Sequence, residues 1–210
     1  MELPVKSLFA VLLWILWCTL HSTLVATTVI DYMRKKLGDW FRFYRLFYNI
    51  VSLATLVPVE YYSVSIRQAP VFQWEGPLVI VKYLLLVASI ALFVAGGSHY
   101  SLSQFLGIRQ IKIGRGTQTL SEYNIFDASG ILSLIRHPWY AAGIMVIWAR
   151  DISLPTLLIN IVISAYFIVG TFLEERKLLL EFGEEYRKYQ KNVSMFIPYK
   201  WIKANIAVVL

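Results

Sequence analysis

Five apolar stretches divide the chain, and their lengths constrain the fold more than any other feature. They cover residues 8–30, 43–64, 77–97, 138–148 and 154–173. A helix needs about 20 apolar residues to cross the ~30 Å hydrocarbon core of a bilayer, and four of the stretches reach that length. Only 16% of the residues are charged, against roughly 25% in soluble domains. The sequence therefore predicts an all-α, polytopic integral membrane protein with about five transmembrane helices.

The fourth stretch is the short one, because the eleven residues 138–148 rise only about 16 Å as a helix. A turn at 150–155 joins it to the fifth stretch, so these two are predicted to form a helical hairpin whose ends return to one side of the membrane. The first stretch lacks a small-residue cleavage pattern and is predicted to be a retained helix. Residues 172–198 combine Glu, Lys and aromatic residues, which predicts a cytoplasmic amphipathic helix that Gly183 would bend or break.

The basic residues predict the orientation. Sixteen of the twenty Lys and Arg residues lie in the segments 34–45, 109–136 and 176–203. By the positive-inside rule these segments face the cytoplasm and the N-terminus lies outside, as in a multi-pass protein of the inner (cytoplasmic) membrane. The net charge of +7 is then explained by topology and by contact with anionic lipids, without nucleic acid.

Cysteine and histidine usage argues against a metal site. Cys18 is the only cysteine, so it has no second thiol for a disulfide or a thiolate site. The three histidines, His21, His99 and His137, are far apart and form no His-x-x-x-His pair. Because repeats are also absent, residues 1–210 are predicted to form a single membrane domain without metal.

Two polar features flank the predicted hairpin. Arg136 and His137 directly precede Pro138, a residue typical of a first helical turn, and free N–H groups at a helix start favour anions. Glu174 and Glu175 follow the fifth stretch, where burial costs several kcal/mol unless cations or donors meet the carboxylates. The hairpin brings both features to one membrane face. Arg136 therefore either pairs with one of these glutamates or holds a ligand in a two-pronged contact.

Residues 98–137 form the longest non-apolar stretch and are predicted to be a cytoplasmic loop. Long loops without periodicity are functional or disordered more often than idle. Within it, Gly114-Arg115-Gly116 lacks the strand-turn-helix context of a phosphate-binding loop, and we interpret it as a flexible turn.

Two motifs carry a family resemblance. The first is Arg136-His137-Pro138-x-Tyr140; the second is Glu174-Glu175-x-x-Leu178-x-x-x-Phe182-Gly183-x-x-Tyr186-x-x-Tyr189 with a later Ile197-Pro198. Over residues 132–198 the chain thereby resembles the isoprenylcysteine carboxyl methyltransferase superfamily, which includes phospholipid methyltransferases. The segments "LHS" at 20–22 and "FLGIRQ" at 105–110 are similar to membrane thiol methyltransferases of the methanethiol type and to NnrU-type membrane proteins associated with nitrogen-oxide metabolism.

The resemblance implies an S-adenosyl-L-methionine site within residues 132–198, facing the cytosol. Glu175 would meet the ammonium group of this cofactor, and Glu174 its ribose or nearby loop groups. Arg136 or Arg109 would be catalytic by favouring the thiolate of an acceptor, since a thiol has a pKa near ~8.5. The full set implied to bind the cofactor is His137, Tyr140, Glu174, Glu175, Tyr186 and Tyr189.

Three further residues are candidates for the acceptor site, each with an alternative. His21 lies at membrane depth, where ionisable groups are often functional, or it is a structural histidine bonded to Ser22 or a carbonyl. His99 sits at a helix end, where it either contacts the acceptor or is an interfacial residue. Gln110, like Arg109, either shapes an acceptor pocket or belongs to a basic loop.

The leading interpretation is an S-adenosylmethionine-dependent methyltransferase that acts on a small or lipid-like apolar acceptor, a thiol or the carboxylate of an isoprenylcysteine. Its partners would be that acceptor and membrane lipids. Alignment of the nucleophile behind the methyl group contributes roughly 7–11 kcal/mol to such reactions. The alternatives are a non-catalytic NnrU-type accessory protein or small-molecule conduit, and a phospholipid amine methyltransferase.

Overall fold

The computed structural model describes residues 2–66, 68–99, 101–113 and 126–209. These residues form helices and connecting segments, with isolated bridges but no named strand, so the predicted all-α class is confirmed. The predicted turn at 114–116 lies outside the described residues, as does the rest of 114–125 within the predicted 98–137 loop.

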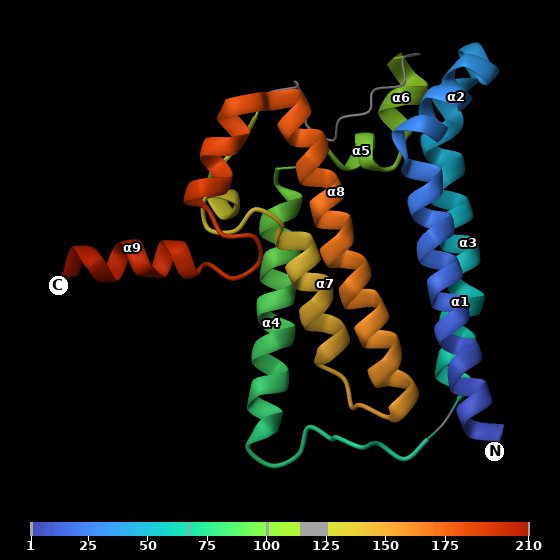
Figure 1. Ribbon diagram of the computed structural model, residues 1–210, viewed down its shortest axis with the longest axis vertical. Coiled ribbons are helices and arrows are strands. Elements are labelled where there is room, and N and C mark those ends of the chain that lie inside the picture. The colour runs from blue at the N-terminus through green and yellow to red at the C-terminus, as the bar shows by residue number, and fades with distance from the viewer. Residues whose placement is uncertain (1, 67, 100, 114–125, 210) are drawn as a thin grey trace. The chain divides into compact units, whose positions relative to one another are not determined.

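Figure 1 labels the helices in chain order. In order they are α1 Glu2–Val25, α2 Thr27–Leu37, η1 Gly38–Phe43, α3 Tyr44–Ser65, α4 Leu78–Gly97, α5 Leu102–Phe105, α6 Ile108–Ile113, η2 Gly130–Ser133, α7 Pro138–Trp148, α8 Leu154–Asn192 and α9 Tyr199–Val209.

The chain is a multi-pass membrane protein. Among the described residues, three helices are long and apolar enough to cross a bilayer, namely Pro4–Val25 of α1, α4 and Leu154–Asn192, which is α8. The helix α3 has 22 residues and contains Pro58, and it falls outside this set. The helix α7 has eleven residues, as predicted. The number of crossings therefore stays a prediction.

The chain divides into two compact units. Unit 1 comprises Met1–Phe72, Tyr100–Glu122 and Ile152–Ile163, and it contains α1, α2, η1, α3, α5, α6 and the beginning of α8. Unit 2 comprises Gln73–His99, Tyr123–Asp151 and Ser164–Leu210, and it contains α4, η2, α7, the remainder of α8 and α9.

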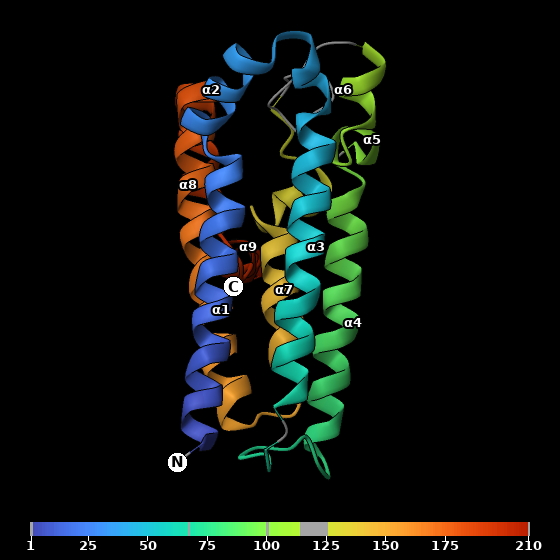
Figure 2. The ribbon, with the colours of Figure 1, turned by 90° about the vertical axis from the view of Figure 1, so that its right-hand side faces the viewer.

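In unit 1, α1 and α3 lie side by side (Figures 1 and 2), joined by indole hydrogen bonds. Trp14 Nε1 donates to Ser63 Oγ at 2.9 Å. The helix α1 ends at Val25 instead of running to residue 30. The hydroxyls of Thr19 and Thr23 donate to carbonyls four residues earlier, a contact that often bends helices.

In unit 2, small residues allow α4, α7 and α8 to approach closely. A Cβ added at Gly96 in α4 would lie 2.7 Å from Cδ1 of Trp139, whose Nε1 donates to Phe93 O at 3.1 Å. A Cβ added at Gly143 in α7 would lie 2.9 Å from the ring of Phe167 in α8. Close approach at small residues is typical of helix packing in membranes, and it fixes the start of α7 between its two neighbours.

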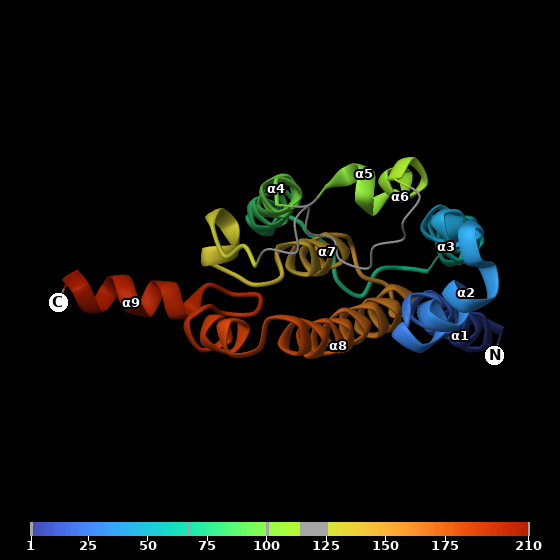
Figure 3. The ribbon, with the colours of Figure 1, turned by 90° about the horizontal axis from the view of Figure 1, so that it is seen from above.

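The last two helices extend the sequence prediction. The helix α8 begins at Leu154 as predicted but continues to Asn192, and Gly183 interrupts it with non-helical angles (φ 55°, ψ −125°) at the predicted break. The helix α9 was not predicted. It projects away from the other helices of unit 2 (Figures 1 and 3), with Trp201 and Ile206 exposed.

Candidate functional site

A short parallel backbone pairing places the Arg-His-Pro triplet beside the end of α8. Ile135 and Ser194 form an isolated bridge. The backbone N–H of Arg136 donates to Ser194 O at 2.9 Å, and that of His137 donates to Met195 O at 3.2 Å. Pro138, which has no N–H, follows these two residues and begins α7. The first N–H groups of a helix have no acceptor within it, so a proline at this position costs no helical hydrogen bond.

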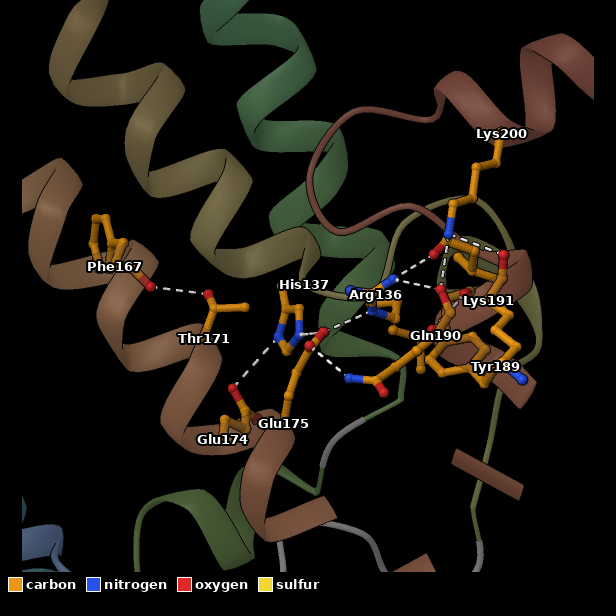
Figure 4. Close-up of polar contacts among 12 residues, drawn as sticks. Arg136, His137, Phe167, Thr171, Glu174, Glu175, Tyr189, Gln190, Lys191 and Lys200 are labelled. Atoms are coloured by element: carbon orange, nitrogen blue, oxygen red, sulfur yellow. Dashed lines mark hydrogen bonds and ion pairs between the residues drawn. The ribbon is translucent and has the colours of Figure 1, made fainter. Parts of the chain in front are cut away.

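The guanidinium of Arg136 makes three hydrogen bonds inside unit 2 through Nε and Nη1 (Figure 4). Its Nε donates to Glu175 Oε1 at 2.6 Å, and its Nη1 donates to the carbonyls of Gln190 (3.2 Å) and Val193. The side chains of Arg136 and Glu175 are only 8% and 7% exposed. Of the two roles predicted for Arg136, these contacts favour pairing with a glutamate.

The carboxylate of Glu175 is shared by three donors. His137 Nε2 lies 3.0 Å from Glu175 Oε1, and Gln190 Nε2 donates to Oε2 at 2.7 Å. His137 Nδ1 lies 3.5 Å from Oε2 of Glu174, whose side chain is 32% exposed. We name Arg136, His137, Glu174, Glu175 and Gln190 the Arg136–Glu175 cluster. It joins the start of α7 to α8, as the hairpin prediction required.

Charge and burial act in opposite directions on His137. Burial by itself lowers the pKa of this imidazole, because it disfavours the charged form. Hydrogen bonds to Glu174 and Glu175, together with their negative charges, outweigh burial and raise the pKa above its ordinary value. The site therefore favours an imidazolium between two carboxylates.

A lysine from α9 donates hydrogen bonds to carbonyls at the end of α8 (Figure 4). Lys200 Nζ donates to Gln190 O at 2.8 Å and to Lys191 O at 2.9 Å. The Gln190 carbonyl also accepts from Arg136, so one oxygen links the start of α9 to the cluster. Sequence reasoning missed Lys200 because it missed α9.

Three rings pack together where the C-terminal part of α8 meets the segment before η2. We name Phe126, Tyr186 and Tyr189 the aromatic wall. The ring of Phe126 lies 5.6 Å from that of Tyr186 and 5.0 Å from that of Tyr189, centroid to centroid. The Tyr189 hydroxyl donates to Leu132 O at 2.6 Å. Tyr186 is only 1% exposed, and its buried hydroxyl has no hydrogen-bond partner among the described residues.

Tyr140, one turn into α7, also faces the cluster. Its ring centroid lies 5.7 Å from that of His137 and 5.7 Å from that of Phe167. The ring of Phe196 lies 6.3 Å from the imidazole of His137. The cluster thus has aromatic faces around its histidine.

His99 has a carboxylate partner that sequence reasoning missed. His99 Nδ1 lies 2.7 Å from Asp127 Oδ2, and Ser129 N donates to Asp127 Oδ1 at 2.8 Å. The hydrogen bonds from Ser129 and His99 lower the pKa of Asp127 to about 2. The sequence offered only the Asp-Ala-Ser-Gly run typical of a turn as a signal.

The remaining candidates belong to unit 1. His21 Nε2 lies 2.6 Å from the Tyr48 hydroxyl, and His21 Nδ1 lies 3.1 Å from Ser52 Oγ. Its ring stacks on Trp17 at 4.9 Å. His21 is therefore hydrogen-bonded, as the structural alternative predicted, and these two partners lie on α3.

Arg109 and Gln110 gather around one neighbour in unit 1. Arg109 Nη1 donates to Gln104 Oε1 at 3.2 Å, and Gln110 Nε2 donates to Gln104 O at 3.0 Å. The segment is held to α3 by Arg45, whose Nε donates to Phe105 O at 3.2 Å. Sequence reasoning counted Arg45 only as a topology signal.

Metal ligation has no geometric support in the described part of the chain. No group of three or more His, Cys, Asp or Glu side chains is arranged there to hold a metal ion. The groups available to a small ligand are instead the half-exposed Glu174 carboxylate, the Tyr186 hydroxyl and the aromatic faces.

Fold and site together define a polytopic membrane protein with a polar centre where a short apolar helix meets a long one. Comparison with known proteins adds the family. The model of the family described as "NnrU protein" matches residues 9–210. The chain belongs to the NnrU protein family, which confirms the resemblance predicted from the sequence.

Several curated relatives are methanethiol S-methyltransferases. The protein of this name from Pseudomonas deceptionensis is 28% identical over 211 residues, which cover 93% of this chain and 74% of that protein. Methanethiol S-methyltransferase 1 of Bradyrhizobium diazoefficiens is 41% identical over 76 residues, 36% of this chain and 27% of that protein. The Mycobacterium tuberculosis protein is 31% identical over 121 residues, 54% of this chain and 49% of that protein. No solved structure matches the chain.

Proposed function

We propose that this protein is an integral membrane methyltransferase that transfers a methyl group from S-adenosyl-L-methionine to a small thiol. The observation that carries the proposal is the similarity to the Pseudomonas deceptionensis methanethiol S-methyltransferase along 93% of the chain. Similarity to other proteins of the same name supports it. Because the charge distribution predicts orientation, the site would face the cytoplasm.

The residues of unit 2 fit the methyl donor. Glu174 is the more exposed carboxylate of the acidic pair and suits an ammonium group or ribose hydroxyls. The buried Tyr186 hydroxyl has no described partner, and an unsatisfied buried group costs about 1–3 kcal/mol. A ligand acceptor would remove that cost. The rings of Tyr140 and Phe196 offer faces that attract a cation such as a sulfonium.

Arg136 and Glu175 would act by positioning. Their mutual ion pair and the carbonyls that Arg136 holds occupy both side chains, so neither is needed to touch the donor. They fix His137 and the start of α7 against α8, and correct placement of reacting groups contributes roughly 7–11 kcal/mol to displacement reactions. This differs from the roles that the family resemblance implied for Arg136 and Glu175.

The donor supplies a methyl group on a positively charged sulfur. The protein must hold the acceptor sulfur behind that methyl and must favour its ionised form, since a free thiol with a pKa near ~8.5 is mostly protonated at neutral pH. Apolar helices around a polar centre would let a volatile or apolar thiol arrive from the bilayer while the donor arrives from water.

The test is a titration of purified protein in detergent with S-adenosylmethionine and with S-adenosylhomocysteine. We expect micromolar binding of both ligands, weakened tenfold or more in Glu174→Gln and in Tyr186→Phe. Glu184→Gln is the matched control, because Glu184 is exposed and its ion-pair partner is Arg187, three residues later. Folded wild-type protein that binds neither ligand would overturn the proposal.

A second candidate function is a non-catalytic NnrU-type accessory protein. It is favoured by the family match over residues 9–210 and by the internal ion pair of Arg136 and Glu175. The same titration, extended to adenosine and to methionine, separates the two candidates, because a non-catalytic accessory protein would have no reason to prefer S-adenosylmethionine over these two fragments.

A further inference from the structure

We propose that His99 is the general base that removes the proton from the acceptor thiol, and that Asp127 positions it for this task. This inference rests on the proposed function, because it names a residue for the thiol-activating step of that reaction. It departs from the expectations drawn from the sequence, which placed Arg136 or Arg109 in this step.

The contact between His99 and Asp127 is the kind that orients a histidine as a base. His99 Nδ1 lies 2.7 Å from Asp127 Oδ2, and an ionised carboxylate accepts the Nδ1–H proton. Asp127 is itself fixed by the Ser129 backbone N–H at 2.8 Å. With Nδ1 as donor, the neutral imidazole keeps its lone pair on Nε2. The same division of roles operates in hydrolytic histidine–aspartate pairs.

The side chain of His99 is 13% exposed, and the residue that packs against its Nε2 is Gly130. Its φ of +53° is a conformation that favours glycine, and an added Cβ would lie 2.9 Å from His99 Nε2. Among the described residues, Nε2 has no hydrogen-bond partner, whereas both nitrogens of His137 face carboxylates. The imidazole of His99 therefore has one nitrogen committed to Asp127 and one available to a ligand.

Two connections place the pair beside the candidate site in unit 2. His99 follows the end of α4, where Gly96 packs against Trp139 in the first turn of α7, and its backbone N–H donates to Gly96 O at 3.1 Å. Asp127 directly follows Phe126, whose ring packs on Tyr186. The pair thus borders both the start of α7 and the aromatic wall.

Arginine cannot do the same chemistry. Arg136 has no acceptor atom and is held by Glu175 and two carbonyls. Among the described residues, Asp127 is the charged group in contact with His99. The described contacts of His99 with α4 and η2 are with Gly96 and Gly130, which do not titrate. The general base is therefore assigned to His99 and not to an arginine.

The step balances without a further reactant. The thiol S–H proton passes to Nε2 of His99, and the bonding pair stays on the acceptor sulfur. That sulfur forms a bond to the methyl carbon while the carbon bond to the donor sulfonium breaks, and its electron pair remains on the donor sulfur. The products are a thioether from each partner, and the imidazolium releases its proton to water.

The test measures kcat/KM for methyl transfer to methanethiol from pH 6 to pH 10 in the wild type and in His99→Gln. General bases contribute typically 10²–10⁴-fold. We expect a loss of about 100-fold or more at pH 7 that shrinks as the pH rises and the thiol ionises by itself. An aryl thiol that is already ionised at pH 7 should react with His99→Gln nearly as fast as with the wild type.

Asp127→Asn is the second variant and Asp31→Asn its matched control, since Asp31 is an exposed partner of Arg34 in α2. We expect a tenfold or larger loss in Asp127→Asn and none in the control. Affinity for S-adenosylmethionine, measured in each variant, should stay within twofold and reports that the fold is intact.

A wild-type pH profile that His99→Gln reproduces, or an equal loss with alkyl and ionised aryl thiols, would overturn the proposal for His99. In both cases wild-type turnover still supports the methyltransferase function. Absence of donor binding and of transfer in the wild type would instead overturn the proposed function and, with it, the role of the histidine.

Discussion

Unit 2 contains two polar centres that each set a histidine against a carboxylate, yet they differ in how fully their groups are used. In the Arg136–Glu175 cluster, the Glu175 carboxylate receives Arg136, His137 and Gln190, and both nitrogens of His137 face glutamates. In the His99–Asp127 pair, only Nδ1 is committed. Burial differs in the same sense, since Asp127 is half exposed and Glu175 is buried.

Under the proposed roles, the first centre stabilises the fold and the second takes part in the reaction. A group whose donors and acceptors are all satisfied gains nothing by leaving its partners, so a closed cluster holds geometry. A histidine with one nitrogen fixed and the other without a hydrogen-bond partner can exchange a proton without loss of an existing contact. The following substitutions should therefore change stability at the first centre and turnover at the second.

Glu175→Gln should have the largest effect on stability. Removal of one charge leaves the buried Arg136 without its counter-ion, and breaking a buried pair costs about 3–5 kcal/mol. The free energy of unfolding in detergent, from denaturant titration, measures the loss. Glu184→Gln, at an exposed i,i+3 pair, should stay within about 0.5 kcal/mol. Equal stability of the two variants would show that the cluster does not hold unit 2 together.

Gly96→Ala should affect both centres, because Gly96 joins the end of α4 to the start of α7. The added methyl would meet Trp139, which cannot turn freely while its Nε1 donates to Phe93 O. Overpacking of this kind costs about 1–3 kcal/mol.

The neighbouring Gly97→Ala is the control, since nothing lies within 4 Å of its added Cβ. That variant should be neutral or more stable by up to about 1 kcal/mol through helix propensity. A stable Gly96→Ala protein would mean that α4 and α7 pack less tightly than the structure indicates.

The closed cluster should make stability depend on pH through His137. Its pKa is raised by folding because Glu174 and Glu175 outweigh burial. The stabilising contribution is therefore complete below the unfolded value of about 6.5 and is lost as the pH rises through the higher folded value. Unfolding free energy should fall across that window in the wild type. His137→Gln should flatten the curve, and an unchanged curve would contradict the contacts.

Lys200→Met should have the smallest effect. Lys200 Nζ stabilises the carbonyls at the end of α8, and loss of these hydrogen bonds should cost about 0.5–1 kcal/mol. Lys203→Met, on the same helix, is the control. A loss of turnover out of proportion to the change in stability would show that α9 controls the cluster, which would blur the distinction between the two centres.

The apolar parts of the fold were predictable from the sequence. Proline at 138 and the polar turn before residue 154 fixed the bounds of α7 and the start of α8, because helix starts and membrane-length apolar runs leave local signals. The end of α1 at Val25 was not predictable by hydrophobicity, since Thr27 to Ile30 remains apolar enough to extend the run. The helix α9 was missed because its apolar residues are interrupted by Lys200 and Lys203.

The candidate site was predictable only in part. The pairing of Arg136 with the acidic pair followed from the hairpin, because two segments that return to one membrane face must share its charges. The partner of His99 did not follow, since Asp127 lies 28 residues away in a segment without periodicity. Contacts made by loops depend on tertiary packing, and a single sequence carries little signal for them.

The central claim is that this membrane protein methylates a small thiol. The most direct measurement supplies purified protein in liposomes with S-adenosylmethionine carrying a labelled methyl group and with methanethiol, and it collects the volatile product. We expect labelled dimethyl sulfide that disappears when S-adenosylhomocysteine is added in excess. Folded protein that yields no labelled thioether from any thiol would contradict it.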